Sequence, residues 1–362
     1  MLNVLKGWFN AWFSDEEAVY LLFLLLAGFA VVLLFGGILA PVLAALVIAY
    51  LLEGPIDFLH RHRFRRLVAA ALVWTVFVVA LLVSIVALVP LLSKQFTQIF
   101  LEIPQIASRL QAWVLTLPQA YPNLFTDAQV QELISGMSLD FGDLRQVIVG
   151  RSKALGVGLT YLVIYLILVP LMVFFMLKDK DKIRGWMRGF LPDDIGLISR
   201  VWGNVDRQLP NYIRGKVVEI LIVWFASYLT FSFLELKFAM LLATATGLSV
   251  LVPYVGATLM TIPVAAVAYV QFGWGGDFAL VMIVYGIIQF IDGNILVPLL
   301  FSEAVNLHPV AIITAILLFG GLWGLWGVFF AIPLATLIKA VINAWPSQSD
   351  YPDPEQKVQE DS

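Results

Sequence analysis

The stretch from residue 67 to 91, LVAAALVWTVFVVALLVSIVALVPL, contains 25 residues and no charged side chain. At a helical rise of about 1.5 Å per residue, about 20 apolar residues cross the hydrocarbon core of a bilayer. A helix also satisfies its own backbone hydrogen bonds, which hydrocarbon cannot do for it. The stretch therefore predicts a transmembrane helix.

The rest of the chain has the same character. Of its 362 residues, 61% are hydrophobic and 13% are charged, and the mean hydropathy is +0.91. Soluble domains carry about 25% charged residues, so the bilayer must be the solvent of this chain. We predict an all-α polytopic membrane protein with about eight transmembrane spans. The apolar runs are residues 18–35, 38–52, 67–91, 154–177, 217–236, 238–272, 278–300 and 308–342.

Several of these runs are predicted to be broken or re-entrant. The first two are short and meet at Gly36 and Gly37, which predicts a hairpin. The sixth and eighth are too long for one simple span, and Pro253 and the glycine-rich residues 320–327 interrupt them. Broken spans are tolerated only where the freed backbone faces protein or a watery cavity.

The distribution of basic residues predicts the orientation. Arginines follow the second run and basic residues fill 178–216, so both segments should be cytoplasmic. Residues 92–150 hold three basic residues against five acidic ones and should face outward, either as a small helical domain or as a helical extension of the third span with a disordered remainder. An even number of crossings places both termini in the cytoplasm. The predicted parts are residues 1–91 (spans one to three), 92–150 (extracytoplasmic helical domain), 151–177 (span four), 178–216 (cytoplasmic amphipathic helices), 217–345 (C-terminal transport-type bundle) and 346–362 (disordered cytoplasmic tail).

The motifs that the chain lacks disfavour an enzyme. The chain has no phosphate-binding glycine loop, no zinc-ligand spacing and no cysteine, and its three histidines are too few for a metal cluster. No domain is basic enough to indicate nucleic acid as a partner. We therefore expect no catalytic site, cofactor or bound metal.

A group of polar residues inside the seventh run is the first candidate site. It comprises Gln289, Asp292, Gly293 and Asn294, with Pro298 shortly after them. A carboxylate at mid-membrane costs about 2.5–3.5 kcal/mol on insertion scales, so Asp292 needs a partner, a proton or water. Gly293 loosens the helix, and Pro298 cannot donate to the carbonyl of Asn294. The group predicts a niche for a cation or a hydroxyl group; the alternative is polar contact between neighbouring helices.

The second candidate is the interruption at Pro253, Tyr254 and Gly256 in the sixth run. Proline opens the backbone, tyrosine offers a ring and a hydroxyl, and glycine allows another helix to approach. The pattern is typical of broken helices at transporter midplanes. A proline kink used only for packing is the alternative.

Two features of the last run are further candidates, and one charged pair stands at the start of the fifth run. His308 is either a proton-sensitive group or, as we favour, the cap of a helix that starts at Pro309. The glycines permit close helix contact or form a gating turn between two half-spans; they include Gly320, Gly321 and Gly324. Glu219 lies within one turn of Lys216 and could pair with it, and no mechanism is built on this pair.

Taken together, these motifs resemble the autoinducer-2 exporter (AI-2E) family of bacterial membrane proteins over about residues 20–345. The resemblance rests on Pro253-Tyr-Val-Gly256-Ala, Asp292-Gly-Asn294 with Pro298, Leu307-His308-Pro309, the glycine cluster and Ala331-Ile-Pro333-Leu-Ala. It implies a multi-pass protein of the bacterial inner membrane that forms a homo-oligomer, with a pentamer known in the family. Asp292 stands where the family often has Glu, and Lys216 where Gln is frequent.

The resemblance and the residues together predict a secondary transporter that exports a small polar organic solute of the autoinducer-2 type. Gln289, Asp292 and Asn294 would form the polar site, opposite the backbone opened at Pro253. One alternative is a sodium/proton antiporter, in which Asp292 would titrate and bind the ion. Another is a membrane scaffold or regulator that acts through residues 92–150 and 178–216.

Overall fold

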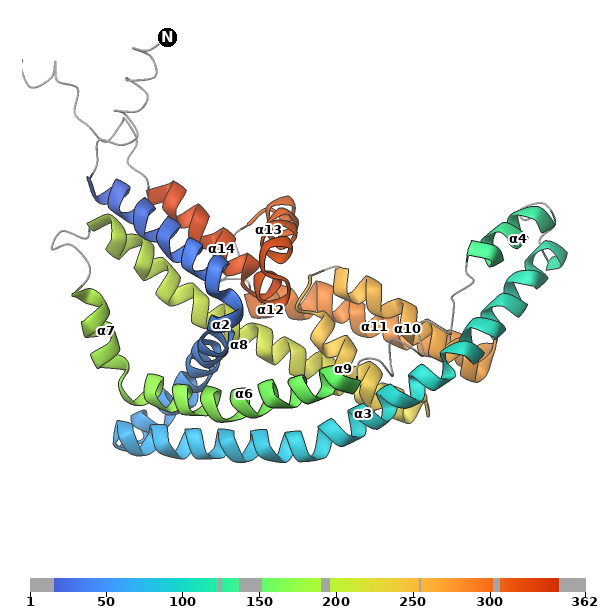
Figure 1. Ribbon diagram of the computed structural model, residues 1–362, viewed down its shortest axis with the longest axis horizontal. Helices are drawn as coiled ribbons and strands as arrows, with labels where there is room; N and C mark the ends of the chain where they lie inside the picture. The colour runs from blue at the N-terminus through green and yellow to red at the C-terminus, as the bar shows by residue number, and fades with distance from the viewer. Residues whose placement is uncertain are drawn as a thin grey trace, which may run out of the picture. The chain divides into compact units, whose positions relative to one another are not determined.

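The computed structural model describes residues 16–120, 122, 126–136, 152–189, 196–253, 255–301 and 307–344. All regular secondary structure in these ranges is helical, which confirms the all-α class (Figure 1). The helices are α2 (Glu16–Arg61), α3 (Arg66–Ala120), α4 (Asp127–Gly136), α6 (Ser152–Lys178), α7 (Lys180–Arg188), α8 (Gly196–Phe233), α9 (Ala239–Ser249), α10 (Val255–Phe272), α11 (Gly276–Ile291), a π-helical segment η1 (Asp292–Leu296), α12 (Val297–Phe301), α13 (Pro309–Trp323) and α14 (Leu325–Ala344). The predicted tail at 346–362 and the candidate residue Tyr254 lie outside the described residues.

Six helical stretches of the described chain are long and apolar enough to cross a membrane. Three shorter apolar helices accompany them, at Ile164–Lys178, Ala239–Ser249 and Pro309–Trp323. Large apolar side chains point outward along the long helices: Leu34 is 77% exposed and Val86 is 74% exposed. Exposed apolar surface on this scale is suited to lipid rather than water, so the multi-pass membrane class is confirmed.

The predicted hairpin at Gly36 and Gly37 is wrong, because α2 runs through both residues without a break. Gly36 instead allows the side chain of Trp323 to pack closely against α2. A Cβ at this position would lie 2.8 Å from Nε1 of Trp323, which donates a hydrogen bond to the carbonyl of Val32 at 2.9 Å. The glycine therefore admits an indole from the far end of the chain, and the helix continues.

The predicted breaks in the sixth and eighth runs are confirmed. The sixth run forms α9 and α10, which are separated by residues 250–254. The eighth forms α13 and α14, which meet at Gly324 with a φ of +58°, a value that favours glycine. A Cβ at Gly320 would lie 2.8 Å from Cγ2 of Val328, so the half-spans also pack closely. Both roles predicted for the glycines, the turn and the close contact, therefore occur.

The segment expected to form an outer domain is partly a continuation of the third span. Helix α3 extends unbroken to Ala120, through Pro90, Pro104 and Pro118. The short helix α4 follows, and residues 137–151 lie outside the described part. The helices α3 and α4 agree with both alternatives, and the side of the membrane on which this segment lies stays a prediction.

The chain falls into two compact units. Unit 1 takes its described residues from 1–70, 172–215 and 301–362, and unit 2 from 71–171 and 216–300. The core of unit 2 is built where α8, α9, α10 and α11 meet, around Phe231, Leu242, Val264 and Tyr285. A small cluster in unit 1 joins α2 and α8 through Leu21, Ile198 and Val201.

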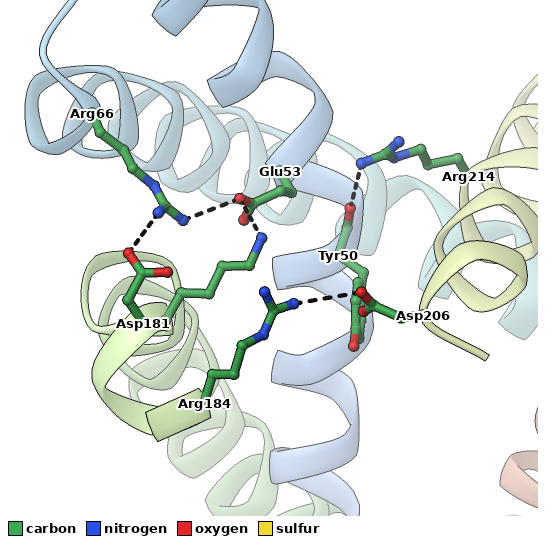
Figure 2. Close-up of polar contacts among 8 residues, drawn as sticks. Tyr50, Glu53, Arg66, Asp181, Arg184, Asp206 and Arg214 are labelled. Carbon is green, nitrogen blue, oxygen red and sulfur yellow. Dashed lines mark hydrogen bonds and ion pairs between the residues drawn. The ribbon is translucent and has the colours of Figure 1, made fainter. Parts of the chain in front are cut away.

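An ionic network in unit 1 ties α7 to α2 and to the start of α3 (Figure 2). Glu53, 13% exposed, accepts from Nζ of Lys180 at 2.8 Å and from Arg66 at 3.2 Å. Arg66 also donates to Asp181 at 2.9 Å. The Glu53 carboxylate of α2 thus binds one cation from α3 and one from α7.

A second pair of contacts in the same view ties α7 and α2 to α8 (Figure 2). Arg184 of α7 lies 3.5 Å from the carboxylate of Asp206, and Arg214 donates to the carbonyl of Tyr50 at 3.4 Å. Some basic residues of the predicted cytoplasmic segment are therefore paired within the protein.

Candidate functional site

Asp292 lies at the point where α11 ends and the π-helical segment begins. Its side chain is 8% exposed, and its Oδ1 atom has no hydrogen-bond partner among the described residues. The backbone N–H of Val297 donates to the carbonyl of Asp292, five residues earlier, which is the π-type bond. Such π turns occur frequently at functional sites. The sequence predicted a loosened helix here but not its π form.

Gln289 lies one turn before Asp292 on the same helix. Both polar atoms of its side-chain amide are buried without a partner among the described residues. Side chains three residues apart lie on neighbouring positions of a helix face. An unsatisfied buried polar group costs about 1–3 kcal/mol, so two such groups together indicate a place that a polar ligand can satisfy.

Lys216 and Glu219 of α8 form a fully buried ion pair. Lys216 Nζ lies 2.6 Å from Glu219 Oε2, and each side chain is 2% exposed. Lys216 also donates to the carbonyl of Val250 at 3.0 Å. Asp292 lies within electrostatic range of both charges. The pairing confirms the prediction, but the burial of the pair was not predicted, because it depends on the approach of α9.

We call Lys216, Glu219, Gln289 and Asp292 the polar cluster. Two further buried hydroxyls lie in unit 2: Ser227 of α8 and Thr246 of α9 are 0% exposed, and neither hydroxyl has a partner among the described residues. Helices α8 and α9 are close here, because a Cβ at Gly247 would lie 2.7 Å from Cβ of Trp224. The interior of unit 2 therefore holds more buried polar groups than the sequence indicated.

The break at Pro253 and Gly256 also lies in unit 2. Pro253 is half-buried in the turn between α9 and α10. Gly256 is buried, and a Cβ there would lie 2.5 Å from the carbonyl carbon of Ser249. The glycine was expected to admit another helix, but it admits the end of α9 from its own broken span. The break leaves backbone carbonyl groups near Val250 without helical partners, and Lys216 binds the carbonyl of Val250.

Three predicted residues around Asp292 do not join the polar cluster. Gly293, Asn294 and Pro298 are exposed on the outer surface of their helix. The Asn294 amide donates to the carbonyl of Phe290 at 2.9 Å, one turn earlier. The expectation that Asn294 shares a site with Asp292 does not fit this arrangement.

The candidates in the last run belong to unit 1, whereas the polar cluster belongs to unit 2. His308 caps α13: its Nδ1 accepts from the backbone N–H of Val310 at 3.3 Å, and proline occupies the first turn. This geometry supports the capping interpretation. Gly320 and Gly324 are used in the close turn described above, and Gly321 is exposed with open space around it.

The described residues contain no group of three His, Asp or Glu side chains that could hold a metal ion. The cluster instead offers one ammonium, two carboxylates and one amide inside a bundle of apolar helices. These groups can hold a small polar molecule by hydrogen bonds, or a proton or cation by charge.

A broken span and a π turn beside buried polar groups are typical of one class of protein, the multi-pass membrane transport proteins. Comparison with known sequences makes the identification specific: the chain belongs to the AI-2E transporter family, whose model matches residues 22–347. The resemblance drawn from the sequence motifs is confirmed.

Individual relatives cover nearly the whole chain. It is 46% identical over 346 residues to the Escherichia coli (strain K12) protein PerM, which is named as a permease. The aligned region covers 96% of this chain and 98% of PerM. It is 26% identical over 302 residues to the transport protein YueF of Bacillus subtilis (strain 168), with 81% and 80% covered. The AI-2 transport protein TqsA of Escherichia coli (strain K12) is 22% identical over 312 residues, with 84% and 86% covered.

Proposed function

We propose that this chain is a secondary transporter that exports a small polar organic solute of the autoinducer-2 type. The observation that carries the proposal is the polar cluster, in which Asp292 and Gln289 present buried polar atoms without partners among the described residues. A relative is named as an AI-2 transport protein, which agrees with this class of solute. The relatives' names indicate transport rather than catalysis.

The chemistry of the cluster suits a hydroxylated molecule. A carboxylate accepts hydrogen bonds from hydroxyl groups, and the Gln289 amide offers two donors and an acceptor. The break between α9 and α10 and the π turn at Asp292 supply two places where a helix can change shape near these groups. Alternating access by movement of broken spans is the mechanism that such features serve in other transporters.

We place the protein in the bacterial inner membrane with both termini in the cytoplasm. The support is the basic loop between α2 and α3 and the basic residues of α7 and early α8. We also propose a homo-oligomer, with a pentamer suggested by the family resemblance.

Flux into proteoliposomes tests the function. Vesicles with purified protein should take up or release small hydroxylated solutes, autoinducer-2 among them, faster than empty vesicles. The Asp292→Asn variant keeps the shape of the side chain and removes its charge, and we expect flux to fall at least about tenfold, because a charged hydrogen bond contributes about 1.5–3 kcal/mol.

The matched control is Asp277→Asn, which removes an exposed carboxylate from the first turn of the same helix. It should leave flux unchanged. If Asp292→Asn transports as well as the wild type, the polar cluster is not the solute site. If no solute in the panel moves, the transport proposal itself fails.

A second candidate function is sodium/proton antiport, in which Asp292 would bind the ion; the observation that favours it is the buried Oδ1 atom of Asp292, which has no partner among the described residues. The role proposed below for Lys216 would exclude this alternative. In vesicles with an imposed pH gradient, antiport appears as loss of the gradient on addition of sodium chloride. Asp292→Asn should abolish this signal; an unchanged signal excludes Asp292 as the ion-binding group.

A further inference from the structure

The ammonium group of Lys216 lies among oxygen atoms. Its Nζ atom is 2.6 Å from the Glu219 carboxylate and 3.0 Å from the carbonyl oxygen of Val250. The carboxylate of Asp292 lies within electrostatic range. All of this is buried, since Lys216 and Glu219 are each 2% exposed and Asp292 is 8% exposed.

These oxygens are the kind that bind a free cation in membrane transporters. Val250 caps the C-terminal end of α9, where the helix gives way to the break at residues 250–254. The last carbonyls of a helix have no partner within it, and they form the negative end of its dipole. In transporters, coupling ions are coordinated by unwound carbonyls and by the C-terminal ends of half-helices. The Lys216 ammonium therefore occupies the position in which such an ion is expected.

We propose that Lys216 is a tethered cation that fills the coupling-ion site of this chain, so that sodium neither binds there nor drives transport. A second cation would meet the ammonium at contact distance and would have to displace it from its ion pair. The site is complete without sodium because the side chain carries the charge. The part of this inference that concerns driving force rests on the proposed transport function, whereas the part that concerns ion binding does not.

Removal of the ammonium should create the missing site. In Lys216→Gln, the Glu219 and Asp292 carboxylates and the Val250 carbonyl lose their cation but keep their positions on three separate segments. Two buried carboxylates without a counter-ion are strongly unfavourable. A sodium ion from solution then restores the balance that the lysine supplied, and bound sodium stabilises the folded protein.

The experiment is thermal unfolding of the full-length protein in detergent, in sodium chloride and in choline chloride of equal ionic strength. The wild type should melt at the same temperature in both salts. Lys216→Gln should melt higher in sodium chloride, by on the order of 3 °C or more, with a dependence on sodium that saturates. The double variant Lys216→Gln with Glu219→Gln lacks the pair's carboxylate and should lose most of this sodium effect.

Folded Lys216→Gln with no sodium effect would overturn the proposal, and so would a saturable sodium effect in the wild type. If Lys216→Gln does not fold in either salt, the test rests on the wild type. Its melting temperature and its solute flux should then be the same with and without sodium, and a sodium effect on either would overturn the proposal. If the wild type moves no solute at all, the proposed function fails, while a sodium effect confined to Lys216→Gln still supports the tethered cation.

Discussion

Gly256→Ala tests the geometry of the broken span most directly. The Cβ of an alanine would overlap the carbonyl oxygen of Ser249, the nearest atom, and would lie 2.5 Å from the carbonyl carbon and 3.1 Å from the Cβ of the same residue. Carbon atoms pack at about 3.5–4.0 Å, so the end of α9 and the start of α10 would have to separate by at least about 1 Å. The atoms in the way are backbone, which cannot turn aside as a flexible side chain can.

The expected net effect is destabilisation. Overpacking of this kind costs about 1–3 kcal/mol, and occasionally more. Alanine returns about 0.5–1 kcal/mol through its better helix propensity. We expect a net loss of up to about 2.5 kcal/mol in the free energy of unfolding. We also expect weaker flux, because Lys216 binds the carbonyl of Val250 beside this corner.

The assay is thermal or denaturant unfolding in detergent, and Gly286→Ala is the control. Gly286 lies within α11 and has no atom within 4 Å of an added Cβ, so alanine there should leave stability unchanged or raise it by up to about 1 kcal/mol. Equal stabilities of the two variants would refute the account of the α9–α10 corner.

Two further predictions concern other parts of the chain. Glu53→Gln leaves Arg66 and Lys180 without their shared carboxylate; since both cations are 35% exposed, we expect a loss of about 1 kcal/mol, seen as a lower melting temperature and faster proteolysis near α7. Unchanged melting and proteolysis would mean that the network does not hold α7. A topology reporter fused after Gln119 should report the outer compartment, and a cytoplasmic signal would invert the orientation.

Much of the fold could be predicted because apolar runs follow directly from the bilayer as solvent. The runs at 67–91 and 278–300 are helices, and the breaks near Pro253 and Gly324 occur as expected. The prediction of a hairpin at Gly36 was wrong for a physical reason. Glycine serves both turns and close packing, and its role in α2 is decided by Trp323, which sequence spacing cannot reveal.

The candidate site was predicted only in part. Asp292 and Gln289 are three residues apart and share a helix face, so their common burial follows from spacing. Asn294 is two residues from Asp292, and residues at that spacing point to different sides of a helix, which explains its exposure. The pairing of Lys216 with Glu219 also followed from spacing. Their complete burial depends on the approach of α9, a tertiary contact with no local signal.

The length of α3 has a mechanical consequence. Beyond the apolar run that ends at Leu91, the helix continues to Ala120, which at about 1.5 Å per residue is roughly 40 Å of rod. Gln95 binds the backbone of α9, and Trp113 contacts Tyr269 of α10, so this rod touches both halves of the broken span. A swing of about 10° at its base would carry its tip through roughly 7 Å. Because Trp113 lies only seven residues before the end of α3, the rod is attached along most of its length, and a rearrangement of the broken span would move α3 with it.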